Sequence, residues 1–331
     1  MNTPNNINEN EYQYAQDVIR KLSDYFDAKV VGQKQLKFSL IASILADGHI
    51  LIESVPGLAK TTAAKAISDA VDGKFARITC TPDLLPGDII GTQIYNQANG
   101  KFETILGPVF ANFVLLDEVN RSSAKTQSAM LEAMQERQVT IGGKTYSMPE
   151  DIFIVIATQN PIEQEGTYPL SEAQTDRFLI KEVITYPTAA EEVEILSRME
   201  SGVISRVDPP VLTIKDIDKV QDIASKVYVD DSIKWYISSI IVASRRTGQM
   251  QNTDIGRYVR IGASPRASIA FLNMSKAAAL MQGRTYVTPE DVKMVRHQVL
   301  RHRIGLNYSA VADNVTVEMV IDGIVNSVKT P

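Results

Sequence analysis

The stretch LIESVPGLAKTTAAKAI, residues 51–67, constrains the fold more than any other part of the chain. An apolar run at residues 49–53 reads as a short strand, and a helix is predicted over residues 61–71. A loop that joins a strand to a helix in this way can bind phosphate with the backbone N–H groups of the helix N-terminus. Lys60 and Thr61 fill the last two positions of the phosphate-loop pattern G-x-x-x-x-G-K-[ST]. The stretch therefore predicts a nucleotide site.

Two residues of the loop depart from that pattern. Ser54 stands at the first glycine position and Ala59 at the second. Alanine costs little there only if its φ angle is negative, and Ser54 likewise needs an ordinary backbone angle. The alternatives are a decayed site or a plain turn around Gly57 that only connects the two elements.

A second apolar run, residues 113–116, ends in the carboxylates Asp117 and Glu118. After a buried strand, the first such carboxylate can hold Mg²⁺ and the second can polarise an attacking water, which is the Walker B pattern. A third run, residues 152–157, leads to Asn160, whose amide could orient that water against the γ-phosphate. The alternatives are an exposed acidic turn and an ordinary turn residue.

Short buried strands that alternate with helices predict an α/β parallel sheet with its ligands at the strand ends. Residues 91–105 and 138–146 alternate like two β-hairpins inserted into this pattern. After residue 187 the pattern becomes helical, and Thr188 begins a capping box, T-x-x-E. We expect an α/β domain over residues 1–186 and a smaller, mainly α-helical domain over residues 187–331.

Composition excludes several other classes of protein. The net charge of -5 argues against an obligate nucleic-acid binder, because phosphate contacts need clustered Lys and Arg. The lone Cys80 rules out an intrachain disulfide and is expected to be a buried small residue. The N-terminus does not resemble a signal peptide, and no apolar run approaches the roughly 20 residues of a membrane span, so we expect a cytoplasmic protein. A solvated helix face or a subunit contact is expected for one basic cluster: Arg296, His297, Arg301, His302 and Arg303.

With these motifs in view, the chain resembles the AAA+ ATPases, and within them the MoxR family of the helix-2-insert branch. The resemblance covers nearly the whole chain. Ala59 is the usual residue of the family, whereas Ser54, Ser171 and Thr175 depart from its glycine, proline and leucine. The segments that carry the resemblance are VVGQ (30–33), VPGLAKT (55–61), LDEVNR (116–121), ATQNP (157–161), GTYPL (166–170), EAQ (172–174), DRF (176–178) and GASPRA (262–267).

The resemblance implies a P-loop NTPase fold with a helical lid, and ATP and Mg²⁺ as cofactors. Lys60 and Thr61 would bind the phosphates and Mg²⁺, Asp117 would complete the metal site, Glu118 would activate water, and Asn160 would sense the γ-phosphate. The remaining nucleotide contacts that the family implies are Val30, Val31 and Gly32 near the adenine, and Ser54, Val55, Pro56, Gly57, Leu58, Ala59 and Thr62 in the loop.

Two arginines take their roles from the resemblance alone. Arg177 would be the arginine finger that reaches the γ-phosphate of a neighbouring subunit, since its permanently charged fork fits phosphate oxygens. Arg266 would be the second sensor, at the start of a helix over residues 266–281 that packs over the nucleotide. For either arginine the alternative is a surface salt bridge.

A finger that acts on a neighbour implies a ring, which we expect to be a hexamer. The family further implies chaperone-like maturation or remodelling of a client complex, often with a von Willebrand factor A-type partner, and hairpins that face the pore or a substrate. One alternative is a nucleotide-gated scaffold with little turnover. Others are a magnesium-chelatase-like motor subunit, against which the GASPRA segment argues, and nucleic-acid remodelling by the hairpins, whose turns each carry a single lysine.

Overall fold

The computed structural model describes residues 7–55, 57–161, 166–202, 208–245 and 256–331. Its N-terminal part is built around a five-stranded sheet with strand order β10-β1-β9-β6-β3, in which all neighbours are parallel. The strands are β1 (Ile50–Glu53), β3 (Phe75–Thr79), β6 (Phe113–Asp117), β9 (Ile154–Gln159) and β10 (Ile180–Val183). The predicted α/β parallel sheet is confirmed.

The three central strands are those that the apolar runs predicted. The two edge strands, β3 and β10, were not predicted, because polar residues interrupt them: Arg77 and Thr79 in β3, and Lys181 and Glu182 in β10. An edge strand is flanked on one side only, so it needs no continuous apolar run.

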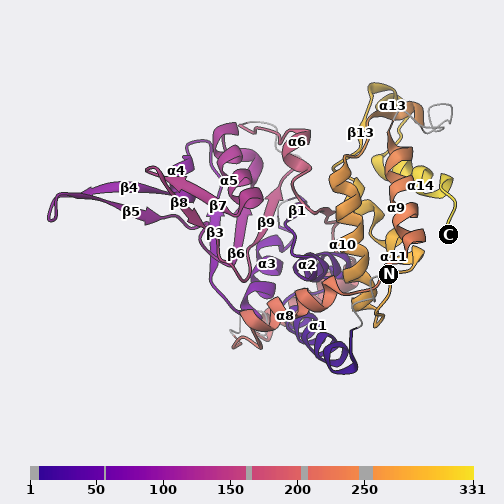
Figure 1. Cartoon of the computed structure of the whole chain (residues 1–331), viewed down its shortest axis with the longest axis horizontal. Helices are drawn as coiled ribbons and strands as arrows, with labels where there is room; N and C mark the ends of the chain where they lie inside the picture. The colour runs from indigo at the N-terminus through magenta and orange to yellow at the C-terminus, as the bar shows by residue number, and fades with distance from the viewer. Residues whose placement is uncertain (1–6, 56, 162–165, 203–207, 246–255) are drawn as a thin grey trace.

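Helices cover both faces of the sheet, as buried parallel strands require. Ile50 and Ile52 pack in one hydrophobic cluster with helices α1 (Glu9–Lys29), α2 (Lys34–Leu45) and α3 (Lys60–Asp69). Leu51 points to the other face and packs in a second cluster with α5 (Ala124–Glu136). Figure 1 shows α5 on one side of the sheet and α1 and α2 on the other.

Both predicted hairpins are present. One pairs β4 (Gly91–Asn96) with β5 (Lys101–Leu106), and the other pairs β7 (Gln138–Ile141) with β8 (Lys144–Ser147). The β4–β5 hairpin follows the short helix α4 (Pro86–Ile90) and projects far from the body of the molecule (Figure 1). The Tyr146 hydroxyl of the second hairpin donates a hydrogen bond of 3.0 Å to Thr104 Oγ1 of the first, so the two hairpins contact each other.

The chain after residue 187 is mainly helical, as predicted. Thr188 caps α7 (Ala189–Glu200) in a capping box with Glu191. The short strand β11 (Leu212–Thr213) then pairs with β2 (Val71–Asp72), and α8 (Ile214–Ser225) follows. The later helices, which Figure 1 shows at the far end from the hairpins, are α9 (Asp231–Ser244), α10 (Pro265–Met281), α11 (Pro289–Met294), α12 (Arg296–Leu300), α13 (Tyr308–Ala312) and α14 (Val317–Ser327).

The division into residues 1–186 and 187–331 stays a proposal.

In the described parts of the chain, none of the helices is both long enough and apolar enough to cross a membrane.

Candidate active site

The predicted phosphate loop lies between the end of β1 at Glu53 and the start of α3 at Lys60. Ser54 is buried, and its N–H donates a hydrogen bond of 3.2 Å to the Gln159 carbonyl on β9. Its φ angle is not positive, so Ser54 meets the condition of an ordinary backbone angle and fits here without strain. Gly57 has a φ of +85°, and an added Cβ would meet nothing within 4 Å. Pro56, one of the predicted contacts, lies outside the described residues.

Lys60 reaches back across this loop. Its side chain is buried, and Nζ donates a hydrogen bond of 3.2 Å to the Ser54 carbonyl oxygen at the start of the loop. The ammonium group therefore lies over the turn, at the N-terminal end of α3, where it can meet phosphate oxygens together with the first N–H groups of the helix. Thr61 follows on the first turn of the same helix.

Ala59 does not meet the condition under which alanine would cost little in this loop, a negative φ angle. It is the N-cap of α3 and has φ +54° and ψ 24°, a left-handed conformation. The left-handed region costs an L-residue with a Cβ about 1–2 kcal/mol. The loop turn thus retains the geometry of a glycine position although alanine occupies it, so the alanine is strained here.

We therefore expect Ala59→Gly to stabilise the protein. The free energy of unfolding should rise by about 0.5–1 kcal/mol, because relief of the left-handed strain exceeds the extra chain entropy of glycine in the unfolded state. Gly57→Ala is the matched control, and it should lower the free energy of unfolding by about 1 kcal/mol. Urea unfolding of both variants measures the two changes. A lower midpoint for Ala59→Gly would contradict the backbone argument.

The two acidic residues of the predicted Walker B pattern are held by the neighbouring strand. Thr158 of β9 donates a hydrogen bond of 2.9 Å from Oγ1 to Asp117 Oδ1. Thr158 Oγ1 also accepts a hydrogen bond of 2.9 Å from the Glu118 N–H. Thr158 is fully buried, so this bridge is shielded from water. Sequence reasoning missed Thr158. The parallel register, which pairs Leu116 with Ala157, places it beside Asp117.

Each of these carboxylates also has an arginine partner. An Arg77 guanidinium nitrogen on β3 lies 2.5 Å from Asp117 Oδ2, and Arg121 Nε lies 2.9 Å from Glu118 Oε2. Glu118 has φ +57° and ψ 52°, an uncommon conformation for a residue with a side chain. The two arginines offset the negative charges of these carboxylates at the place where a metal ion and phosphates would bind. Sequence reasoning assigned neither arginine a role.

Asn160 lies at the end of β9 and is buried. The Asn120 side chain donates a hydrogen bond of 3.3 Å to the backbone carbonyl of Asn160, which connects the segment after β6 to the segment after β9. Asp117, Glu118 and Asn160 thus gather at the carboxyl ends of adjacent parallel strands, next to the phosphate loop at the end of β1.

The donor set suits Mg²⁺ bound together with a nucleotide. Among the described residues, no group of three or more His, Cys, Asp and Glu side chains is placed to hold a metal. Mg²⁺ is usually held by one or two carboxylates, waters and substrate phosphates rather than by a cage of protein ligands. Asp117, which Thr158 fixes, and the Thr61 hydroxyl fit that description.

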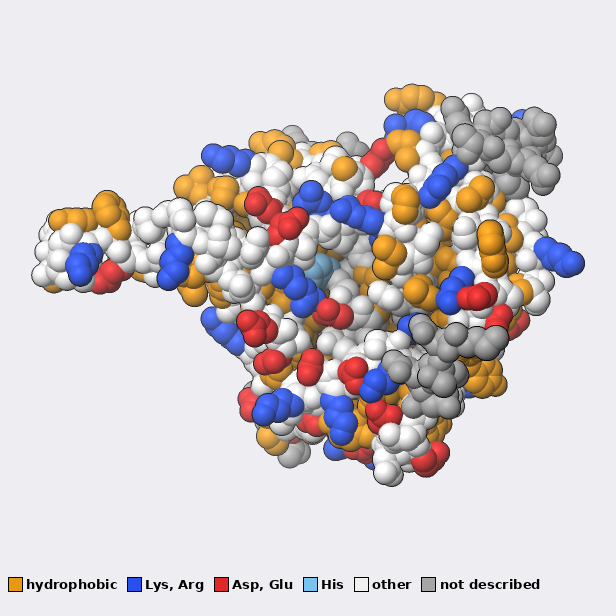
Figure 2. All heavy atoms as spheres, in the orientation of Figure 1, with side chains coloured by type: hydrophobic (Ala, Val, Ile, Leu, Met, Phe, Trp, Pro, Cys, Tyr) orange, Lys and Arg blue, Asp and Glu red, His pale blue; other side chains and the backbone are white. Residues whose placement is uncertain are grey.

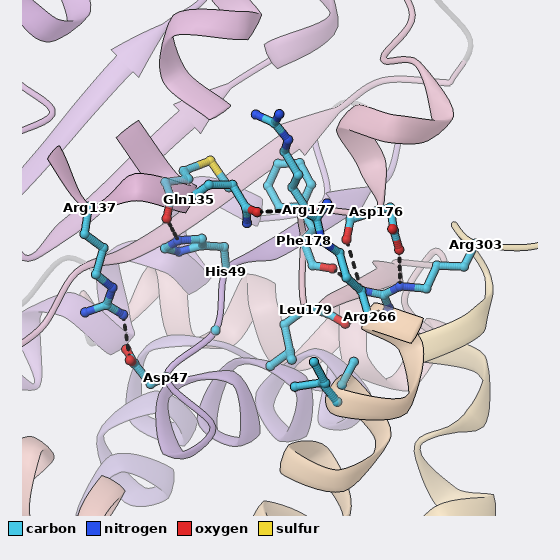
Figure 3. A pocket seen from close by; sticks show the side chains of 14 residues that line it. Asp47, His49, Gln135, Arg137, Asp176, Arg177, Phe178, Leu179, Arg266 and Arg303 are labelled. Atoms are coloured by element: carbon cyan, nitrogen blue, oxygen red, sulfur yellow. Dashed lines mark hydrogen bonds and ion pairs between the residues drawn. The ribbon is translucent and has the colours of Figure 1, made fainter. Parts of the chain in front are cut away.

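A pocket of about 240 Å³ lies at the opposite, amino-terminal edge of the sheet, and we call it the arginine pocket. His49, which precedes β1, and Arg177, which precedes β10, both line it. Arg266, from the first turn of α10, also lines it and donates a hydrogen bond of 2.9 Å to Gln135 Oε1 of α5 (Figure 3). The structure therefore brings the two predicted arginines together.

This placement corrects the expectation that the helix of Arg266 packs over the nucleotide. None of the described phosphate-loop residues lines the arginine pocket. The strand β1 with its flanks separates the two sites by roughly 15 Å, at about 3.3 Å per residue. In its own chain, Arg266 is a neighbour of Arg177 and not of Lys60.

Arg303 holds the backbone next to Arg177. Its buried guanidinium pairs with Asp176 at 2.8 Å and donates hydrogen bonds to the carbonyls of Phe178 (2.6 Å) and Leu179 (3.0 Å) (Figure 3). Ser264, the N-cap of α10, donates a further hydrogen bond of 2.8 Å to Asp176. The chain before β10 is thus fixed from the helical part of the molecule.

The basic cluster is therefore not a solvated helix face, and that part of the expectation was wrong. Arg301 pairs with Glu318, and both Arg296 and His297 pair with Asp322. Burial lowers the pKa of His302 well below its ordinary value. The acidic partners are distant in sequence, so the local charge pattern could not predict these internal pairs.

Two other reactive residue types are inert here. Burial lowers the pKa of His49 to about 4, and its Nδ1 accepts a hydrogen bond of 3.1 Å from the Val155 N–H, so the ring is neutral at physiological pH. Burial likewise raises the pKa of the Cys80 thiol to about 11. Cys80 is the buried small residue that the sequence predicted.

Comparisons with known proteins agree with this arrangement. Residues 49–180 match a model described as "ATPase family associated with various cellular activities (AAA)", and residues 251–324 match an AAA lid domain. The chain is 47% identical to Chaperone MoxR1 of Mycobacterium tuberculosis, over 91% of this chain and 79% of that protein. It is 40% identical to the uncharacterized protein YeaC of Bacillus subtilis, over 95% of each chain.

A solved structure of a Cytophaga hutchinsonii protein has a TM-score of 0.89 and 43% identity, over 98% of both chains. A phosphate loop and two acidic residues at one edge of a five-stranded parallel sheet, followed by a helical lid, form an α/β P-loop fold of the AAA+ type. Taken with the long, strong match to a MoxR chaperone, these features show that the chain belongs to the MoxR family of AAA+ ATPases.

Proposed function

We propose that the chain is a Mg²⁺-dependent ATP hydrolase whose active sites are shared between neighbouring subunits of a ring in the cytoplasm. The observation that carries this proposal is the separation of its catalytic parts. The phosphate loop, Asp117, Glu118 and Asn160 lie at the carboxyl edge of the sheet. Arg177 and Arg266 lie together in the arginine pocket at the amino edge.

Within one site, each residue has a separate role. Lys60 and the N–H groups of α3 bind the phosphates, with Val30, Val31 and Gly32 beside the adenine. Asp117 and Thr61 bind Mg²⁺, which would neutralise phosphate charge when bound. Glu118 orients and polarises the attacking water, and Asn160 contacts the γ-phosphate. The Thr158 bridge fixes Asp117 and the Glu118 backbone relative to each other.

The two arginines act on a neighbouring subunit. Among the described residues, the Arg177 guanidinium forms no ion pair, and Figure 3 shows it pointing away from the contacts that hold Arg266 and Arg303. Since roughly 15 Å separates them from their own phosphate loop, their target is the nucleotide of the next copy. AAA+ proteins commonly oligomerise, and we propose a hexamer in which the second sensor, like the finger, acts in trans.

The β4–β5 hairpin is the proposed contact with a client. Tyr95 is 56% exposed and Phe102 is 68% exposed, and their rings meet edge to face with centroids 5.4 Å apart. Figure 2 shows hydrophobic side chains on this projecting arm. Exposed aromatic pairs are common anchors in protein recognition. Turnover would move the hairpins and drive chaperone-like maturation or remodelling of a client complex, with a von Willebrand factor A-type protein as partner.

Removal of the loop lysine tests the proposed nucleotide site. Lys60→Ala should abolish Mg²⁺-dependent ATP turnover and weaken ATP binding, because the loop loses its only positive charge. Lys65→Ala is the matched control, since Lys65 lies on the exposed side of α3, and it should retain both. Equilibrium ATP binding and phosphate release on the same samples provide the measurement. Full turnover by Lys60→Ala would overturn the assignment of this loop.

A further inference from the structure

Helix α7 exposes three large apolar side chains on the side that faces away from its own chain. Val193 is 63%, Leu196 is 66% and Met199 is 62% exposed. A surface helix normally turns its apolar face inward. We call these three residues the α7 face.

The polar side of α7 faces the body of the molecule instead. A Cβ added at Gly32 would lie 2.4 Å from Glu191 Oε1, which places this carboxylate against the segment before α2. Arg198 donates a hydrogen bond of 2.6 Å to the Asp27 carbonyl on α1. The outward direction of the α7 face is therefore fixed by contacts on the opposite side of the helix.

The position of α7 in the fold identifies what could cover this face. Strand β10 pairs in parallel with β1, and its last residue, Val183, lies opposite Glu53 at the start of the phosphate loop. The Gln33 side chain donates a hydrogen bond of 3.3 Å to the Thr185 carbonyl just beyond. Helix α7 thus begins at the edge of the sheet where the nucleotide binds, whereas Arg177 lies at the other end of β10.

The protein surfaces near the two ends of β10 are also complementary in charge. On its solvent side α7 carries the exposed carboxylates Glu192 and Glu200. The arginine pocket offers Arg177 and Arg266, and next to them Ile269 is 60% exposed. An acidic, apolar surface near the nucleotide thus matches a basic, apolar surface near the arginines.

We propose that the α7 face binds the arginine-bearing flank of a second copy of this chain. The inference rests on the proposed function, because a neighbour whose Arg177 reaches this nucleotide must approach from the side where α7 begins. The contact is heterologous, with a different surface from each copy, which is the arrangement that closes into a ring. The α7 face is then covered in the assembly and exposed in the isolated chain.

Leu196→Glu tests this interface. A glutamate would replace the apolar contact, so association should weaken roughly 10- to 100-fold. In sedimentation velocity with Mg²⁺-ATP, the variant should remain dissociated at concentrations where the wild type assembles. Its turnover should fall with assembly, while ATP binding per subunit stays unchanged. Trp235→Glu is the matched control, since Trp235 of α9 is 75% exposed and belongs to neither of the two proposed surfaces, and it should assemble like the wild type.

Mixing variants tests the direction of the contact. Leu196→Glu retains an intact arginine flank, and Arg177→Ala retains an intact α7 face and nucleotide site. A mixture should therefore hydrolyse ATP faster than either variant alone. Normal assembly of Leu196→Glu would overturn the proposal, even if the variant lost the ability to bind another protein. If the wild type neither assembles nor hydrolyses ATP, the proposed function itself fails.

Discussion

Arg177→Ala is expected to lower kcat for ATP about 10³- to 10⁵-fold, the range known for arginine fingers, while ATP binding survives. The guanidinium lies in the arginine pocket, roughly 15 Å from the phosphate loop of its own chain. It therefore contributes nothing to binding within one subunit and stabilises the transition-state charge at the next. Steady-state turnover and equilibrium ATP binding, measured on the same samples, separate the two effects.

Arg137→Ala is the control for Arg177→Ala. Arg137 lines the same pocket, but it forms an ion pair of 2.6 Å with Asp47 of its own chain. Because that pair is partly exposed at the surface, its loss should change stability by less than about 1 kcal/mol and leave turnover near the wild-type value. Equal losses of turnover in the two variants would mean that the pocket only maintains structure. An Arg177→Ala protein with wild-type kcat would contradict the shared site.

Glu118→Gln is expected to lower kcat about 10²- to 10⁴-fold, the range for loss of a general base, without loss of ATP binding or assembly. The amide keeps the shape of the side chain and the backbone bond to Thr158, but it cannot accept a proton from water. Glu132→Gln, on the exposed side of α5, is the control and should be fully active. Chemically quenched single-turnover hydrolysis measures the chemical step directly.

The same variant separates a motor from a nucleotide-gated scaffold. The contact of 2.9 Å between Arg121 and Glu118 is the observation that favours a scaffold, because it engages the carboxylate that must meet water. A motor loses its biological activity with Glu118→Gln, whereas a scaffold that needs only ATP binding keeps it. Retained maturation of a client by Glu118→Gln would therefore contradict hydrolysis as the driving step.

The central part of the fold could be predicted because its signals are local. Strands buried on both faces, such as β6 and β9, appear as continuous apolar runs, and the hairpins appear as alternating segments around short turns. The phosphate loop, Asp117 and Glu118 follow from short motifs. Strands β3 and β10 have polar residues in their edge positions, so no local pattern distinguishes them from loops.

The remaining features depend on contacts between distant segments. Thr158 holds Asp117 only because β6 and β9 are paired in parallel. Arg303 is buried and holds the neighbouring backbone only because Asp176 lies beside it in the fold. The left-handed backbone of Ala59 is set by the loop around it and not by alanine itself. The position of Arg266 depends on how the helical part packs against α5, which no motif encodes.

The shared active site is tested most directly by the specific ATPase activity of the wild type as a function of protein concentration, with ATP binding per subunit measured in parallel. Turnover per subunit should rise with concentration, reach a plateau where sedimentation shows full assembly, and vanish on dilution, while binding per subunit stays constant. Constant turnover per subunit in samples that contain only monomers would show that one chain completes its own site, and would contradict the account.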